Sequence, residues 1–220
     1  MLSSKEIEAQ LKLIPLHYIH YNYSPVEYGK GVSIGISAYP YLRERQPHLI
    51  PSEKDFCNAF IAKTINLFPV EKLMCDYEKY RLGLECRAKR AYRSLVREEH
   101  CITRMREIME LYGFNILYDN EDDWRKGIDV TIIDRKLGRE HYVHLFVDSP
   151  SSRKHRKNKA FRGNGRDFST HVDFPFDKTQ GKKVGDFYLY SDEQIYRFMR
   201  KLRTDFKHMG VSLGEKQVQG

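Results

Sequence analysis

The sequence predicts an α/β domain that follows an N-terminal extension. One sign is a long amphipathic stripe over residues 84–112, which is typical of a helix. Another is a pair of short apolar runs, residues 127–134 and 142–148, joined by a polar link that contains Gly138. Such runs predict two strands and a hairpin turn. A third is the helix predicted from Ser191 onward, which comes after further strand-like segments.

The composition describes a globular chain with a basic surface. Its 220 residues suit one domain of moderate size, or one domain with a smaller appendage. The formal net charge of +8 favours a polyanionic partner, and nucleic acid is the first candidate. Basic proteins with other roles are common, so charge alone does not decide the partner.

The cysteines and the start of the chain bear on location. No two of the four cysteines form a C-x-x-C pair, which argues against a structural zinc site. The chain opens with charged residues instead of a signal sequence, and no apolar run approaches the length of a membrane span. We therefore expect a cytoplasmic protein with reduced cysteines and no membrane partner. The cysteines are Cys57, Cys75, Cys86 and Cys101.

Residues 1–80 predict an N-terminal extension that is rich in aromatic side chains and helices. A short helix over residues 3–14 is followed by a tyrosine- and histidine-rich stretch at 16–28. Its aromatic rings either stack on nucleic-acid bases or pair across strands, and we favour pairing. Ser52 with Asp55 three residues later predicts the start of a second helix. This extension can pack on the core that follows, and it is a candidate surface for a protein partner.

The core is expected over residues 81–210, with a flexible tail at 211–220. A short amphipathic piece at 70–80 precedes the strongest helix, 84–112, which Gly113 ends. Glu98 falls inside the apolar stripe of that helix, so it needs an arginine, a backbone donor or a metal-bound water as a partner. A salt bridge to a neighbouring arginine is at least as well founded as a functional role.

Two acids stand out in the predicted hairpin. Asp129 lies in the first apolar run, and Asp148 lies at the tip of the second. A carboxylate in a β-branched run is costly to bury unless something binds it. Two of them on neighbouring strands suggest Mg²⁺ or Mn²⁺, because hard cations prefer oxygen ligands.

A dense basic run follows Asp148, and no acid interrupts it before Asp167. The run is either an ordinary solvated segment or a contact for phosphate, and we favour phosphate. The candidate nucleic-acid-binding residues are Arg153, Lys154, Arg156, Lys157, Lys159, Arg162 and Arg166.

Three more elements complete the predicted core. Residues 169–176 predict a strand ended by Pro175, and residues 184–190 predict one further strand. The last helix begins at Ser191 or Asp192 and has one apolar and one basic face.

From residue 84 to about 205, the element order resembles the restriction-endonuclease-like superfamily, named PD-(D/E)XK for its motif. The resemblance implies a three-layer α/β/α core with a mixed central sheet. It implies that Glu98, Asp129 and Asp148 take the places of the helix glutamate, the second-strand aspartate and the third-strand acid. The run Gly127-Ile128-Asp129-Val130 looks much like the second-strand signature of that family.

The chain departs from the family at the lysine. Its triplet reads Asp148-Ser149-Pro150, so Pro150 stands where the family has lysine. In some members the lysine has moved to an adjacent element, and Lys154 and Lys157 are the nearest candidates here. Lys159 is a weaker one.

Three hypotheses follow. The first is a metal-dependent nuclease acting on DNA, in which Asp129 and Asp148 hold Mg²⁺ and Glu98 orients a metal-bound water. Lys154 or Lys157 would then stabilise negative charge on the phosphate. The second, favoured by Pro150, is a degenerate nuclease-fold protein that binds nucleic acid or a protein without cleavage. The third is a protein-interaction module, of the kind that phages and mobile elements encode.

Three histidines lie close to the predicted site. His141 and His144 are three apart on one strand, so they are expected to face opposite sides of it. His144 shares a face with Asp148 and can approach a metal, but a packed or hydrogen-bonded histidine is the favoured interpretation. His155 is a candidate general base if the lysine role is vacant.

Overall fold

The computed structural model describes residues 2–17, 32–65, 70–118, 128–149, 152 and 171–204. Predictions for the aromatic residues beyond 17, the basic run and the tail lie outside these ranges. Within them the chain is a mixed α/β structure with a four-stranded sheet, which confirms the fold class at that level. No described helix combines the length and apolarity that crossing a membrane requires.

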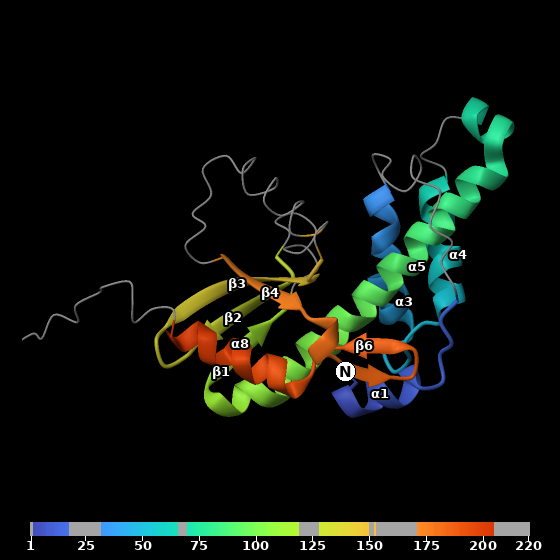
Figure 1. The fold of residues 1–220 in the computed structure, drawn as a ribbon. Helices are drawn as coiled ribbons and strands as arrows, with labels where there is room; N and C mark the ends of the chain where they lie inside the picture. The colour runs from blue at the N-terminus through green and yellow to red at the C-terminus, as the bar shows by residue number, and fades with distance from the viewer. Residues whose placement is uncertain are drawn as a thin grey trace, which may run out of the picture.

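Helix α5, Val70–Met109, is the longest element and runs through the molecule (Figure 1). Its 40 residues correspond to about 60 Å at the usual rise of an α-helix. The sequence predicted two helices here, at 70–80 and 84–112, whereas the structure joins them. The end was predicted well: α5 passes into a short 3₁₀ turn, η2 (Glu110–Tyr112), and Gly113 adopts the left-handed conformation with φ 88°.

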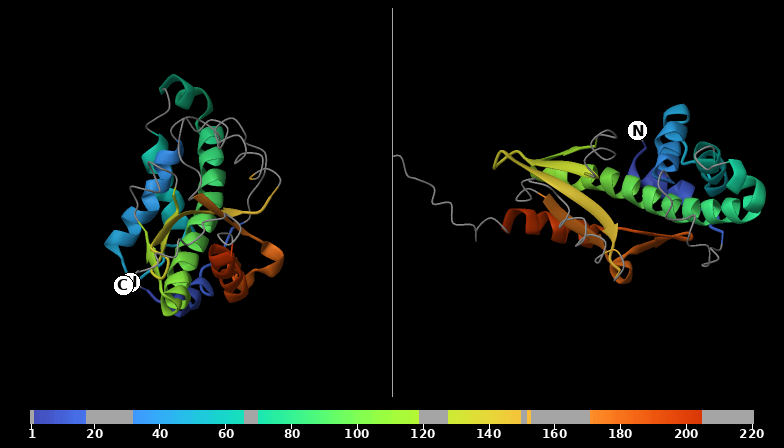
Figure 2. Two further views of the ribbon diagram at one scale, coloured as in Figure 1. Left: turned by 90° about the vertical axis from the view of Figure 1, so that its left-hand side faces the viewer. Right: turned by 90° about the horizontal axis from the view of Figure 1, so that it is seen from above.

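The first hydrophobic core surrounds the N-terminal half of α5. It contains α1 (Ser4–Leu11), η1 (Val32–Ser37), α3 (Ala38–Arg45) and α4 (Glu53–Ile65). Seen from above, α3 and α4 lie at one end of α5, and the sheet lies at the other (Figure 2). The aromatic rings at the centre of this core are Tyr39, Phe56, Phe60 and Tyr92.

Local signals explain where α1 and α4 begin. Ser3 and Glu6 form a reciprocal capping box at the start of α1. Ser52 accepts a hydrogen bond from the Asp55 N–H at 3.1 Å and so caps α4, as the sequence predicted.

The single strand predicted at 184–190 is wrong. The structure forms a two-stranded hairpin instead, with β5 (Lys182–Val184) and β6 (Phe187–Leu189) antiparallel. Gly185 turns the chain with φ 55°, a conformation that favours glycine. The hairpin packs in the first core, although it is distant from that core in sequence.

The four-stranded sheet has the order β1-β2-β3-β4. β1 (Phe114–Leu117), β2 (Val130–Asp134) and β3 (Arg139–Val147) are successively antiparallel, and β4 (His171–Phe176) is parallel to β3. The predicted hairpin between β2 and β3 is present, with Gly138 at φ 62°. Pro175 lies inside β4 instead of ending it, which an edge strand tolerates.

One face of the sheet packs against the C-terminal half of α5 and against α8 (Asp192–Thr204). Phe174 of β4 stacks on Phe198 of α8, with ring centroids 4.1 Å apart. The strand residues of this first face are Phe114, Ile116, Val130, Ile132, Val143, Leu145, Phe174 and Phe176. The alternate residues form the second face. The helices that the structure describes cover only the first face, so the expected third layer stays a prediction.

The boundary predicted at residue 80 falls inside α5. Leu84, Ala88, Tyr92 and Val96 of α5 belong to the first core, and the helix enters the second core from Cys101 onward. The extension and the sheet therefore share one helix, and each core depends on it.

Two glycines allow the docking of the hairpin to be tested. A Cβ at Gly185 would lie 2.7 Å from the backbone oxygen of Leu11, whereas a Cβ at Gly138 would meet nothing within 4 Å. Gly138→Ala should cost about 1 kcal/mol of unfolding free energy through its positive φ alone. Gly185→Ala should cost about 2 kcal/mol more, because α1 must also move. Urea denaturation measures both, and equal losses would contradict the packing of the hairpin against α1.

Candidate functional site

Three strand ends point in the same direction along the sheet, and an aspartate flanks each of them. Because β2 is antiparallel to β3, and β3 is parallel to β4, the start of β2 and the ends of β3 and β4 point the same way. The strands β3 and β4 end side by side, and β3 runs four residues past the start of β2. Asp129 precedes β2, Asp148 follows β3 and Asp177 follows β4. We call these three residues the acidic edge.

Asp129 has a defined structural role. Its backbone N–H donates to the Val143 carbonyl at 3.1 Å, and its carboxylate accepts the N–H of Leu145. The carboxylate thus replaces a backbone carbonyl at the point where β2 stops pairing with β3. This contact explains why an acid is tolerated at the head of an apolar strand.

Asp148 extends the pairing of the parallel strands. Its N–H donates to the Phe176 carbonyl at 2.9 Å. Asp177, the next residue of the neighbouring strand, accepts from the Thr179 N–H at 2.8 Å and from its hydroxyl at 2.7 Å. These bonds lower the pKa of Asp177, and the charge of Asp148 opposes the shift. The sequence prediction did not include Asp177, although it repeats the pattern of an apolar strand followed by aspartate.

The spacing separates Asp129 from Asp148. Val130 pairs with Val143, so Asp129 lies beside His144, four residues before Asp148. At about 3.3 Å per residue, the two Cα atoms are about 13 Å apart along the strand. Mg²⁺ holds its ligands at about 2.1 Å, too short a reach to join the two carboxylates in this arrangement.

The acidic edge therefore does not fit one Mg²⁺ or Mn²⁺ shared by Asp129 and Asp148. Among the described residues, no group of three or more histidine, cysteine, aspartate or glutamate side chains is arranged to hold a metal ion. Metal binding by this pair stays a prediction without geometric support.

Glu98 lies on α5, half-buried, and one of its partners is the Ser94 hydroxyl, which donates at 2.9 Å. Burial raises the pKa of Tyr190 well above its usual value, and Cys101, Glu98 and Asp129 add to the shift.

Arg97 joins the middle of α5 to the end of the sheet, and the sequence did not single it out. Its Nε donates to the Tyr188 carbonyl at 2.9 Å, and its guanidinium lies 4.5 Å from the centre of the Phe176 ring. Burial lowers the pKa of Arg97. Sequence pattern offers little signal for such a residue, because helix 84–112 is rich in arginine.

The predicted phosphate-binding residues all lie outside the described ranges, and so do Lys154 and Lys157 as substitutes for the lysine. The point where the basic run begins is described. Ser152 contacts the strand end through its hydroxyl, which donates to the carbonyls of Val147 and Ser149. In the sequence, Arg153 and the rest of the basic run follow Ser152 directly.

The two histidines of β3, His141 and His144, face opposite sides of the sheet, as predicted. His141 is buried on the first face beside Ile132, and burial lowers its pKa. His144 lies on the second face, where its neighbour on β4 is Asp173.

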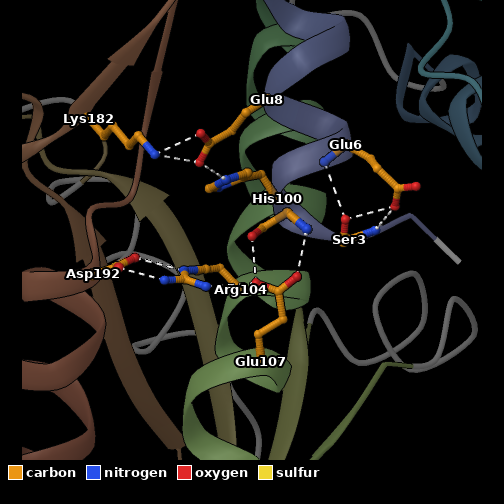
Figure 3. A network of polar contacts seen from close by, with 9 residues as sticks. Ser3, Glu6, Glu8, His100, Arg104, Glu107, Lys182 and Asp192 are labelled. Carbon is orange, nitrogen blue, oxygen red and sulfur yellow. Dashed lines mark hydrogen bonds and ion pairs between the residues drawn. The ribbon is translucent and has the colours of Figure 1, made fainter.

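A polar network ties the two cores together (Figure 3). Glu8 of α1 binds Lys182 of β5 at 2.7 Å and His100 of α5 at 3.1 Å. Arg104 of α5 binds Asp192 of α8 at 2.6 Å. Burial opposes ionisation of Glu8, but hydrogen bonds from Lys182 and His100 leave its pKa below the usual value. The network positions elements and offers no arrangement of reacting groups.

Three comparisons, with protein-family models, curated proteins and solved structures, found no match. Function is therefore inferred from the residues alone.

The role of Asp129 can be separated from that of a metal ligand. In metal-free buffer, Asp129→Ala should lower the free energy of unfolding by about 2 kcal/mol, because the Leu145 N–H is left without its charged acceptor. Asp129→Asn keeps an acceptor oxygen and should restore part of this stability. If Asp129 served only as a metal ligand, its removal from the metal-free protein would relieve electrostatic repulsion and would not lower the free energy of unfolding. An alanine variant at least as stable as the parent in urea would contradict the structural role.

The buried histidine of the network predicts a pH dependence. Burial lowers the pKa of His100, so the unfolded chain takes up this proton first as the pH falls below about 6.5. The stability linked to neutral His100 is present above that pH and is lost as the pH falls toward the folded pKa. His100→Gln should flatten the dependence of the urea midpoint between about pH 7 and pH 5. The exposed His48→Gln serves as control, and equal slopes in both would contradict this role.

Proposed function

We propose that this chain binds nucleic acid through its phosphate backbone, with DNA as the favoured target, on a scaffold whose element order is like that of PD-(D/E)XK nucleases. The observation that carries the proposal is the basic run of the sequence, which follows directly after Ser152, the residue whose hydroxyl contacts the end of β3. The run contains arginine and lysine without any acid, on a chain of net charge +8. Such a run favours a polyanionic partner.

Binding without cleavage is the better supported form of this function. Hydrolysis of a phosphodiester by the family's route needs a metal ion at the strand ends. Asp129 is engaged with Leu145, and Asp148 is about 13 Å away along the strand. Pro150 also stands at the lysine position of the motif.

Helix α8 is a secondary candidate for phosphate contact. The side chains of Arg197 and Arg200 are 57% and 68% exposed, but both lie within 3.7 Å of Glu193. This carboxylate offsets part of their charge, so the basic run ranks above α8.

A metal-dependent nuclease remains the second candidate. One observation favours it: the order of helix, three antiparallel strands and a parallel fourth strand. In that case Lys154 or Lys157 would supply the missing lysine.

The binding proposal predicts a salt effect that depends on the basic run. Fluorescence anisotropy with labelled single- and double-stranded DNA and RNA measures affinity against salt. Changing the run to glutamine should reduce the slope of log K on log salt by about 0.9 for each duplex phosphate that the run neutralises. The residues changed are Arg153, Lys154, Arg156, Lys157 and Lys159.

A matched control changes five exposed lysines elsewhere to glutamine and should alter the slope less. They are Lys5, Lys12, Lys54, Lys136 and Lys183. Equal effects of the two variants would contradict a specific role for the run. A complex with a protein that survives high salt, without affinity for nucleic acid, would favour the interaction-module hypothesis.

The same labelled substrates distinguish binding from hydrolysis. Incubation with Mg²⁺ or Mn²⁺ should leave them intact. Cleavage that disappears in both Asp129→Ala and Asp148→Ala, each checked for folding, would replace the binding proposal with the nuclease.

A further inference from the structure

Three elements meet at the end of the molecule where α5 and α8 finish. The Tyr112 ring of η2 packs edge-on against Tyr196 of α8, with centroids 6.3 Å apart, and the Tyr112 carbonyl accepts a hydrogen bond from Arg203 at 2.6 Å. The Gly113 carbonyl accepts the Arg135 N–H of the β2–β3 turn at 3.0 Å. The turn and the last residues of α8 lie at this end in both ribbon views (Figures 1 and 2). We call the surface of η2, the turn and the last turns of α8 the η2 end.

Hydrogen bonds fix the β2–β3 turn. Asp134, the last residue of β2, accepts the Lys136 N–H at 2.9 Å through its side chain and the Leu137 N–H at 3.3 Å through its carbonyl. Gly138 closes the turn with φ 62°. Arg203 Nε lies 3.5 Å from the other carboxylate oxygen of Asp134, so this buried charge is offset from within the protein. Asp134 therefore does not cancel the positive charges of the turn.

Three apolar side chains are exposed at the η2 end. Leu111 is 83% exposed, Leu137 is 49% exposed and Tyr112 is 43% exposed. Single exposed apolar residues are normal on a protein surface, but these three come from adjoining elements. Side chains exposed to this degree gain free energy when a partner removes them from water.

Two rows of exposed cations accompany these apolar side chains. Arg135 and Lys136 belong to the turn, and Arg200 and Lys201 belong to α8. The segment η2, which carries Leu111, contacts both the turn and α8. Two rows of positive charge beside an apolar strip complement the two rows of phosphates that border a groove of duplex DNA.

Exposed acids offset only part of this charge. Glu110 of η2 and Glu140 of β3 are exposed, and Glu193 of α8 lies 3.6 Å from Arg200. Glu140 accepts the Tyr142 hydroxyl at 3.2 Å, and both residues alternate onto the second face of the sheet, away from α8. The η2 end therefore favours an anionic partner.

We propose that the η2 end binds duplex DNA, with the two cationic rows on the phosphates of opposite strands and Leu111 in the minor groove between them. Apolar side chains, leucine included, enter the minor groove in this way in proteins that bend DNA. The inference rests on the proposed function and adds a second contact to it, on a surface that the structure describes. It also makes duplex DNA the preferred form of nucleic acid.

Leucine substitution in the full-length protein separates the groove contact from the phosphate contacts. Leu111→Ala should weaken duplex binding about tenfold, which corresponds to losing roughly half of the burial of one leucine. The slope of log K on log salt should not change, because no charge is removed. Leu13→Ala is the matched control, because Leu13 follows α1 and is also 83% exposed. Equal duplex affinities of the two variants, both checked for folding in urea, would overturn the proposal.

A charge variant tests the two rows. Lys136→Gln combined with Lys201→Gln should reduce the salt slope for duplex DNA by about 0.9 for each phosphate contact that is lost. Lys5→Gln combined with Lys54→Gln changes two exposed lysines elsewhere and should leave the slope as in the parent. Lys136 is also one of the five control lysines above, and that control should change the slope through this residue alone. An unchanged slope in the Lys136 and Lys201 variant would overturn the proposal.

The outcomes distinguish this inference from the proposed function. Weaker binding by the basic-run variant, while Leu111→Ala binds as the parent does, overturns this inference alone. Weaker binding by Leu111→Ala and by the two-lysine variant, while the basic-run variant binds normally, supports it and overturns the role of the basic run. A parent that binds no nucleic acid overturns both. Self-association that requires Leu111 in sedimentation velocity, without any effect on DNA binding, would assign this surface to a second copy of the chain instead.

Discussion

The continuity of α5 is the constraint on which the rest of the structure depends. One helix supplies Leu84, Ala88 and Tyr92 to the first core, and Met105 and Met109 to the second. Neither core is closed without it, because α3 and α4 cover one half and the sheet covers the other. The buried apolar side chains contribute most of the stabilisation, and the polar network of Figure 3 fixes the relative position of the elements around them.

This constraint also places the candidate sites. Arg97 and Glu98 lie where α5 passes from one core to the other, and Arg97 contacts Phe176 at the end of β4. Ser152 contacts the end of β3, and the hydrogen-bonded His144–His171 pair occupies the second face of the sheet.

Sequence reasoning succeeded where one residue type decides a local structure. Ser52 marked α4, Gly113 marked the end of α5 and Gly138 marked the hairpin. It failed at Gly185, because an apolar stretch with one glycine is compatible with one strand or with two. Sequence reasoning also could not give the distance between Asp129 and Asp148. The sequence shows that two strands carry acids, but only the register shows how far β3 extends past the start of β2.

Native-state hydrogen exchange tests the continuity of α5 most directly. If both cores depend on one helix, amides from Leu84 to Val96 and from Cys101 to Met109 should open together, with one free energy that falls equally with denaturant. Exchange of the first segment at a free energy well below that of the second would contradict this account. The extension would then be a separate unit, and α5 would be two helices in solution.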